Sequence, residues 1–213
     1  MKQILFVAFV FTIVLSCSKE KSEPMPAEAA SYAPLTIGSY WVYSHFKINS
    51  FTGEEEQLEI VDSVVVVGDT VINSETYSVF YGTRAVFSGR GPGIISLLRD
   101  SSGFLIDNEG KVHFATNFPQ QVLRTDHLIL DGGDTIYTVN YTMEDVKQEI
   151  TAPAGQFITL NFKGELIDNV HENPRYLNNY FAEGVGKVID TYFYIAQNEY
   201  YFERRLKKYH IAD

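Results

Sequence analysis

Short alternating runs of apolar and polar residues, each ended by glycine, proline, asparagine or aspartate, recur from Tyr40 to the end of the chain. No stretch of ten or more residues there repeats its apolar residues with the helical period of 3.6. Abundant tyrosine and phenylalanine also favour strands. The pattern predicts an all-β fold with little helix beyond the first sixteen residues: a single antiparallel, strongly curved sheet, or an open barrel or sandwich.

Two turn signals place hairpins within this pattern. In Pro153-Ala154-Gly155, proline fixes φ and glycine accepts a positive φ, so a tight turn is expected. Gly68-Asp69 follows the apolar run Val64–Val67 and predicts a second turn, which would end a strand over 58–67.

One hairpin pattern occurs twice, at 98–107 and at 181–190, with glycine, isoleucine and aspartate at matching positions. A second pattern, Leu-x-x-Gly-(Ser/Asp)-x-(Trp/Ile), begins at Leu35 and again at Leu130. Both stretches at 98–107 and 181–190 are predicted to be β-hairpins. The order of the matches favours two repeated meander halves, about 32–120 and 126–213, although short apolar-and-glycine patterns also recur by chance.

The N-terminus has the features of a signal peptide over residues 1–16. Lys2 precedes an apolar run from Ile4 to Leu15, which is short for a membrane span. The run ends in Val-Leu-Ser-Cys17, which resembles the lipobox of bacterial lipoproteins, where the cysteine becomes diacylated on sulfur. Cys17 is also the only cysteine, so a lipid on its sulfur explains it better than a disulfide.

Residues 17–31 combine serine, lysine, glutamate, proline and alanine without apolar periodicity, and are predicted to form a flexible, lipid-anchored tether. Residues 32–213 then form a single β domain. The expected location is the cell envelope, with the lipid on Cys17 holding the chain at a membrane. Ser18 is not acidic, which resembles the sorting signal for the outer membrane in enteric bacteria.

The charge of the chain argues against nucleic acid as a partner. Removal of residues 1–16 takes away Lys2 and no acidic residue, so the formal charge of −10 becomes −11. Such a surface repels phosphate backbones.

Three motifs carry a resemblance to a known group: Pro34-Leu35-x-x-Gly38-x-x-Trp41-x-Tyr43, Ala152-Pro153-Ala154-Gly155-x-Phe157 and Tyr180-Phe181-Ala182-x-Gly184-Val185-Gly186. They resemble a widespread, uncharacterised group of Gram-negative envelope lipoproteins, distantly similar to open β-barrels of the lipoprotein-carrier type. The resemblance covers most of the body and implies a lipid-like ligand for some members, but no catalytic residue. This chain departs from the group through a glycine-rich insertion at 89–93 and the lack of a lid helix.

The sequence offers no catalytic or metal-binding constellation. The five histidines, at 45, 113, 127, 171 and 210, are scattered without the spacing of a zinc site. No Gly-x-Ser-x-Gly nucleophile elbow is present. We therefore expect neither an enzyme nor a metal or other cofactor, and a hydrolase is the least favoured alternative.

Aromatic rows are the remaining functional signal. Trp41 and Tyr43 share one strand face, as do Tyr192 and Tyr194 near the last hairpin. These four residues are either core or the lining of a site for an apolar or glycan ligand, because tyrosine has an apolar body and a polar tip. The function classes left open are a binding module, a structural or interaction subunit of an envelope complex, and an enzyme.

Three Asp-(Ser/Thr)-apolar tripeptides resemble acceptor sites for envelope O-glycosylation in some Gram-negative bacteria. The acceptors would be Ser63, Thr70 and Thr135. The same tripeptides also mark ordinary turn-to-strand transitions. An intact mass equal to polypeptide plus lipid would exclude the modification.

Overall fold

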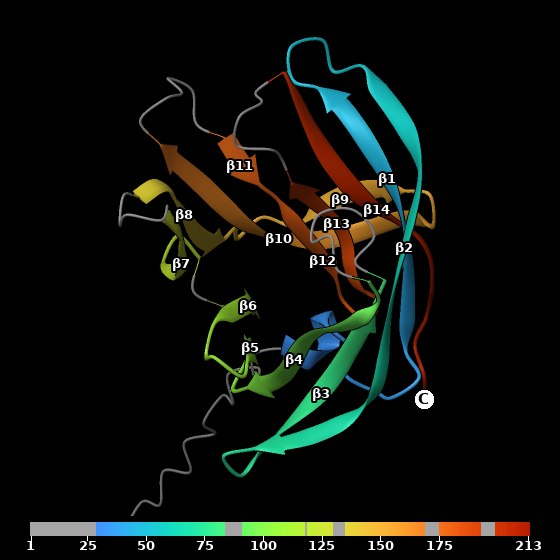
Figure 1. The fold of residues 1–213 in the computed structure, drawn as a ribbon, viewed down its shortest axis with the longest axis vertical. Coiled ribbons are helices and arrows are strands. Elements are labelled where there is room, and N and C mark those ends of the chain that lie inside the picture. The colour runs from blue at the N-terminus through green and yellow to red at the C-terminus, as the bar shows by residue number, and fades with distance from the viewer. Residues whose placement is uncertain (1–28, 84–90, 118, 130–134, 169–174, 193–198) are drawn as a thin grey trace, which may run out of the picture.

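The computed structural model describes residues 29–83, 91–117, 119–129, 135–168, 175–192 and 199–213 (Figure 1). Within these ranges the helical element is the short 3-10 helix η1 (Ala29–Tyr32), and no helix is long and apolar enough to cross a membrane. The strands of the described ranges are β1 (Tyr40–Asn49), β2 (Glu55–Ile72), β3 (Glu75–Gly82), β4 (Gly93–Ser101), β5 (Phe104–Asp107), β6 (Val112–Ala115), β7 (Val122–Ile129), β8 (Thr135–Met143), β9 (Gln148–Ala152), β10 (Gly155–Asp168), β11 (Arg175–Leu177), β12 (Asn179–Ala182), β13 (Gly186–Tyr192) and β14 (Tyr200–His210).

All these strands belong to one antiparallel sheet, which confirms the predicted fold class. Its order is β6-β5-β4-β3-β2-β1-β14-β13-β12-β10-β8-β7, with β9 and β11 attached to β10. The first and last strands, β1 and β14, pair along their whole lengths and lie next to each other in the middle of the sheet. The sheet curls into a nearly closed barrel whose seam lies between β6 and β7 (Figure 1).

The side chain of Arg124 bridges this seam. The Arg124 guanidinium on β7 donates from Nη1 to the carbonyl oxygen of Val112 on β6 at 3.0 Å. The same guanidinium lies 3.7 Å from the centre of the Tyr141 ring, a cation–π distance. Arg124 therefore joins the two edges of the sheet where no strand ladder does so among the described residues.

The turn predicted at Gly68-Asp69 is wrong. β2 continues through both residues to Ile72, and the register against β3 shifts between Val66 and Gly68. The chain turns instead at Asn73 and Ser74, which take positive φ angles of 51° and 68°. A glycine inside a strand can mark a β-bulge as well as a turn, and a bulge increases the local twist of the strand. Similar register shifts occur in β1 and β3, and together they help to curve the sheet.

The other hairpin predictions are confirmed. Residues 98–107 fold into β4 and β5, and residues 181–190 fall within β12 and β13. The first pair is joined at Ser102-Gly103 with positive φ at both positions, the geometry of a two-residue hairpin turn. The second has a three-residue connection, because Ala182 pairs with Gly186. Pro153 and Ala154 form the predicted turn, with Ala152 paired to Gly155.

The predicted repeat can be compared with the sheet, although duplication stays a prediction. Strands β1–β6 form one continuous section and β7–β14 the other. The second section is not a simple meander, because β10 pairs with β8 as well as with β9.

The segment before β1 enters the interior of the sheet. η1 lies against β4, β5 and β13, and the Ser31 carbonyl accepts a hydrogen bond from the Gly184 amide at 2.6 Å. The Tyr32 ring stacks on Phe114 at 4.9 Å, and Phe114 contacts Phe181 at 4.8 Å. The final residues of the predicted tether thus lead directly into the core. Cys17, the signal peptide and the rest of the tether lie outside the described residues.

Candidate functional site

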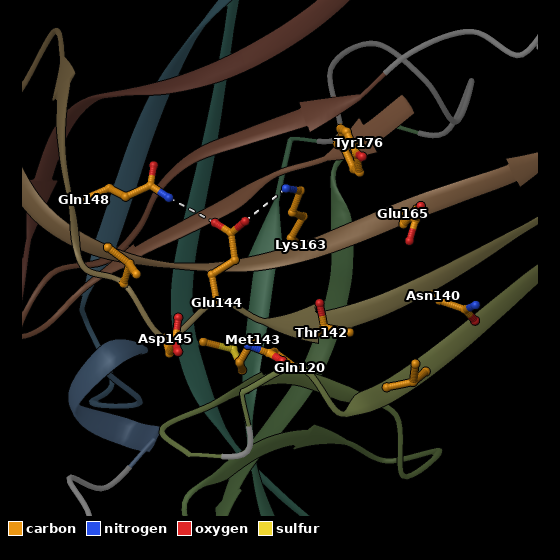
Figure 2. Close-up of a pocket in the computed structure, with 12 residues that line it drawn as sticks. Gln120, Asn140, Thr142, Met143, Glu144, Asp145, Gln148, Lys163, Glu165 and Tyr176 are labelled. Carbon is orange, nitrogen blue, oxygen red and sulfur yellow. Dashed lines mark hydrogen bonds and ion pairs between the residues drawn. The ribbon is translucent and has the colours of Figure 1, made fainter. Parts of the chain in front are cut away.

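An open groove of about 590 Å³ lies on the outer face of β8 and β10 (Figure 2). Asn140, Thr142 and Lys163 point into it, and they alternate with residues whose side chains fill the core. Glu144 holds the groove together: Oε2 accepts from Gln148 Nε2 and Oε1 from Lys163 Nζ, each at 3.0 Å. Because these polar groups already satisfy one another, the groove is the weaker candidate for a site.

A smaller cavity of about 250 Å³ lies on the inner face of the curved sheet. Most of its wall is apolar and comes from the first half of the chain, with a polar part contributed mainly by β4, β6, β13 and β14. The apolar part includes Trp41, Tyr43, Val64, Phe80, Leu98 and Leu105. The polar part is Ser96, His113, Lys187 and Arg204.

Trp41 and Tyr43 line the cavity with their rings, while the indole N–H of Trp41 and the hydroxyl of Tyr43 are hydrogen-bonded to backbone carbonyls. Trp41 is 4% exposed, and its Nε1–H donates to the Val185 carbonyl at 2.6 Å. The Tyr43 hydroxyl donates to the Lys187 carbonyl at 2.9 Å, and burial raises the pKa of this phenol. These two bonds tie β1 to β13 and to the turn before it, and they leave aromatic carbon facing the cavity.

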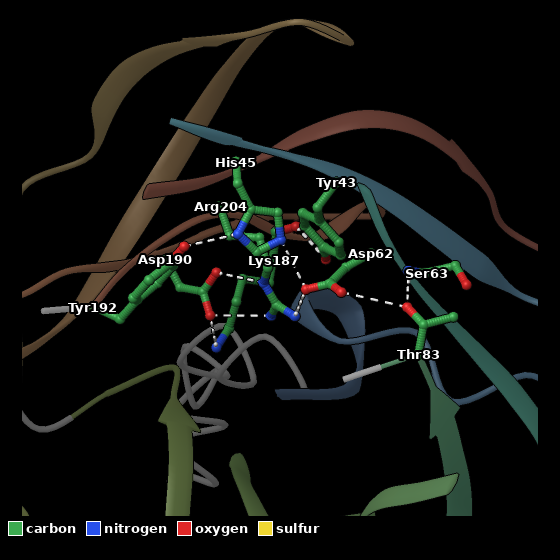
Figure 3. Close-up of polar contacts among 9 residues, drawn as sticks. All are labelled: Tyr43, His45, Asp62, Ser63, Thr83, Lys187, Asp190, Tyr192 and Arg204. Carbon is green, nitrogen blue, oxygen red and sulfur yellow. Dashed lines mark hydrogen bonds and ion pairs between the residues drawn. The ribbon is translucent and has the colours of Figure 1, made fainter. Parts of the chain in front are cut away.

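An interior charge cluster, formed by His45, Asp62, Lys187, Asp190 and Arg204, lies beside the cavity (Figure 3). Arg204 is its centre. Its Nε and Nη2 donate to the two oxygens of Asp190 at 2.8 and 3.0 Å, a bidentate ion pair. Nη1 lies 3.7 Å from Asp62 Oδ2, and the guanidinium lies 4.6 Å from the centre of the Tyr43 ring.

His45 anchors the far side of this cluster. It is 1% exposed, and both ring nitrogens have partners: Nε2 lies 2.8 Å from Asp62 Oδ2, and Nδ1 lies 2.8 Å from the Tyr192 hydroxyl. Asp62 Oδ1 also accepts from Thr83 Oγ1 at 3.3 Å. A hydroxyl, an imidazole and a carboxylate in sequence resemble a nucleophile triad. Here the imidazole is enclosed, so the arrangement holds Asp62 in place rather than presenting a reactive group.

Lys187 and Arg204 reach the cavity from within this cluster. Their side chains keep 28% and 22% of their surface accessible, although protein surrounds them. Lys187 Nζ donates to Asn179 Oδ1 at 2.9 Å and lies 3.7 Å from Asp190 Oδ2. Burial lowers the pKa of the Lys187 ammonium, and Asp190 opposes that change. For Asp190, burial favours a higher pKa, but Arg204 and Lys187 outweigh it and lower the pKa.

The lowered pKa of Asp190 predicts a loss of stability in acid. An aspartate whose folded pKa lies below its unfolded value of about 3.9 stabilises the fold above that value, and the contribution disappears as pH falls through the folded pKa. The free energy of unfolding should therefore fall between about pH 5 and pH 2 more steeply in the wild type than in Asp190→Asn. Urea unfolding at a series of pH values measures both slopes, and equal slopes would contradict the assignment.

The structure brings together some of the residues expected to line a ligand site. Trp41 and Tyr43 line the cavity, whereas Tyr192 lies at the charge cluster, where it bonds His45 and stacks on Phe202 at 5.3 Å. Tyr194 lies outside the described residues.

The three candidate glycosylation positions differ in accessibility. Thr135 is exposed at the start of β8, whereas Ser63 and Thr70 are half-buried within the long strand β2.

No sequence pattern indicates the charge cluster. A histidine alone in a strand is usually a surface or packing residue, and the bonding partners of His45 lie on other strands, β2 and β13. Within the described ranges, no group of three or more histidine, cysteine, aspartate or glutamate side chains is arranged to hold a metal ion.

Comparison with known proteins gives a likeness of fold. No family model matches the chain, and no curated protein matches it. A candidate exported protein with a YmcC-like fold from Bacteroides fragilis NCTC 9343 matches with a TM-score of 0.51 at 14% identity, over 82% of this chain and 96% of that one. A candidate lipoprotein from Parabacteroides distasonis ATCC 8503 has a TM-score of 0.45 at 13% identity, over 83% and 97%, which is too weak to argue from. The chain shares its fold with the Bacteroides fragilis protein, and that likeness extends to the fold alone.

Proposed function

We propose that this protein is a lipid-anchored envelope protein that binds a small apolar ligand inside its curved sheet without catalysing a reaction. The anchor would be the lipid on Cys17, and the outer membrane is the favoured location because Ser18 is not acidic. The signal peptide and the lipobox-like ending support the location. The Bacteroides fragilis protein with the same fold is itself a candidate exported protein, which agrees with it.

The cavity beside Trp41 carries the binding proposal. A partly open space of about 250 Å³, bounded by the buried side chains Phe80, Leu98 and Leu105, lets a ligand enter and contact apolar groups. It is smaller than the ~300–1,000 Å³ typical of sites for drug-sized ligands. The size therefore favours a small molecule or one hydrocarbon chain over a lipid with two chains.

The hydrogen bonds of the wall favour an apolar ligand over a glycan. A sugar needs donors and acceptors around its hydroxyl groups, but the tips of Trp41 and Tyr43 are already bonded to backbone carbonyls. The rest of this side of the cavity is hydrocarbon. A glycan would lose hydrogen bonds to water there without replacing them.

The second candidate function is that of an interaction subunit of an envelope complex. A row of apolar side chains on the outer face of the sheet favours it. Tyr40 pairs with Val65, Val65 with Tyr81, and Tyr81 with Ile94, so these side chains form one row across four strands. Tyr81 is 39% exposed and Ile94 54%. Exposed apolar patches on soluble domains often mark partner surfaces. A Tyr81→Glu variant that loses a co-purifying protein partner would favour this function.

Trp41 provides a direct test of binding, because it is the only tryptophan in the chain and lines the cavity. Decan-1-ol, a single hydrocarbon chain with a neutral end, is a suitable probe. We expect a saturable change in tryptophan fluorescence at one probe per protein. The absence of a saturable change up to the solubility of decan-1-ol would contradict the binding proposal.

Replacement of Cys17 tests the anchor separately. Cys17→Ala removes the sulfur that would carry the lipid, so the chain should move from the membrane fraction to the soluble periplasmic fraction. Cell fractionation with immunoblotting measures the shift, and Ser16→Ala, which keeps the cysteine, is the control. A Cys17→Ala protein that stays in the membrane fraction would show that something else holds it there.

A further inference from the structure

The polar part of the cavity wall presents positive charge to a ligand. Lys187 and Arg204 reach the cavity, but the two carboxylates that balance their charge, Asp62 and Asp190, are not part of its lining. Over the whole cluster the charges cancel. At the cavity surface, however, a ligand lies nearer to the cations than to the carboxylates behind them.

Both cations act only as hydrogen-bond donors. Neither a lysine ammonium nor an arginine guanidinium can accept a hydrogen bond. Two of the Arg204 donor groups are committed to Asp190. Lys187 carries three N–H groups, of which Asn179 takes one and Asp190, at 3.7 Å, faces another. The contacts of the described residues therefore leave Lys187 with donor capacity toward the cavity, and a ligand group that fits there must be an acceptor.

An anionic acceptor fits this position better than a neutral one. Burial disfavours the charged form of Lys187 and lowers its pKa, so a second nearby anion would offset part of the cost of keeping the ammonium charged. Charge-assisted hydrogen bonds are roughly twice as strong as neutral ones. A cationic end would instead meet two like charges.

We propose that the ligand is a single-chain amphiphile whose carboxylate end binds Lys187, with its hydrocarbon chain against Trp41 and the apolar wall. This assignment rests on the proposed binding function and names the ligand class for the same cavity. Arg204 also lines the cavity, and its bidentate pair with Asp190 neutralises the carboxylate that lies nearest to Lys187.

Three probes with the same chain separate the end groups without any substitution. Decanoate, decan-1-ol and decylamine are titrated into the full chain at pH 7, with Trp41 fluorescence as the readout. Decanoate should bind at least tenfold more tightly than decan-1-ol, a difference of about 1.4 kcal/mol, and decylamine should bind most weakly. Decan-1-ol binding as tightly as decanoate would overturn the carboxylate assignment.

A substitution then locates the contact. Lys187→Met keeps the length of the side chain and removes its charge, so the affinity for decanoate should fall at least tenfold, and by a larger factor than the affinity for decan-1-ol, whose neutral end loses no ion pair. Lys163→Met is the matched control, because Lys163 lies on the outer face and pairs with Glu144. An unchanged affinity for decanoate in a folded Lys187→Met protein would overturn the role of Lys187. If that variant does not fold, the three-probe comparison on the wild type still decides the ligand class.

The two proposals fail in different ways. If neither decanoate nor decan-1-ol binds, the cavity is not a site for an apolar ligand and the proposed function is wrong. If both bind equally, the binding function stands and only the carboxylate assignment is wrong.

Discussion

Replacing Arg204 with alanine is expected to lower the free energy of unfolding by about 3 kcal/mol. The change removes both bonds to Asp190 and leaves that carboxylate inside the sheet without its main counter-charge. Breaking a buried ion pair costs about 3–5 kcal/mol. We expect the lower end because 22% of the Arg204 side chain remains accessible through the cavity. Denaturant unfolding measures the loss.

The neighbouring arginine is the matched control. Arg205 pairs with Glu55, which is 48% exposed, and with Glu203, which is 15% exposed. An ion pair with a group as exposed as Glu55 typically contributes about 0–1 kcal/mol. Arg205→Ala should therefore cost less than Arg204→Ala, which leaves Asp190 inside the sheet without its main counter-charge. Equal losses in the two variants would show that the interior charge cluster does not stabilise the fold as its geometry indicates.

Filling the cavity is expected to abolish ligand binding while the fold is retained. Ser96 lines the cavity from β4, and a phenylalanine there would occupy much of the space of about 250 Å³. Overpacking a filled core costs about 1–3 kcal/mol, but here the ring enters a space that already exists. Titration of Ser96→Phe with decan-1-ol should show no saturable change in Trp41 fluorescence, and its denaturation midpoint should stay close to that of the wild type.

The adjacent residue provides the control for this variant. Leu97 follows Ser96 on β4 and pairs with Val79, so its side chain points to the opposite face of the sheet. Leu97→Phe should bind decan-1-ol as the wild type does. If Ser96→Phe binds the probe unchanged, the ligand does not occupy the cavity.

The sequence was sufficient to predict the sheet and the shared face of Trp41 and Tyr43. Alternation with a period of two depends only on local chain geometry, so it can be recognised without knowing which strands pair with each other. The turn at Gly68-Asp69 was predicted wrongly because glycine marks a bulge as well as a turn. The turn at Asn73-Ser74 has a weaker signal, since neither residue is glycine.

The charge cluster could not be predicted because it depends on how distant strands pair. His45 on β1 lies next to the partners of Arg204 only because β14 pairs with β1 and β13 pairs with β14. A shift of one residue in either register would turn these side chains to the other face. Tyr192 shows the same limit, since its hydroxyl bonds His45 beside the cluster and it is not among the residues that line the cavity.

Native mass spectrometry of the Cys17→Ala chain, purified from its own host, would detect a ligand retained in the cavity. We expect a fraction of molecules with one bound species of small mass, released on mild activation and identified as a single-chain carboxylate. The same species should be missing from Ser96→Phe and present in Leu97→Phe. A bound species that persists unchanged in folded Ser96→Phe, or a Cys17→Ala chain that carries none and takes up neither decanoate nor decan-1-ol, would contradict ligand binding in the cavity.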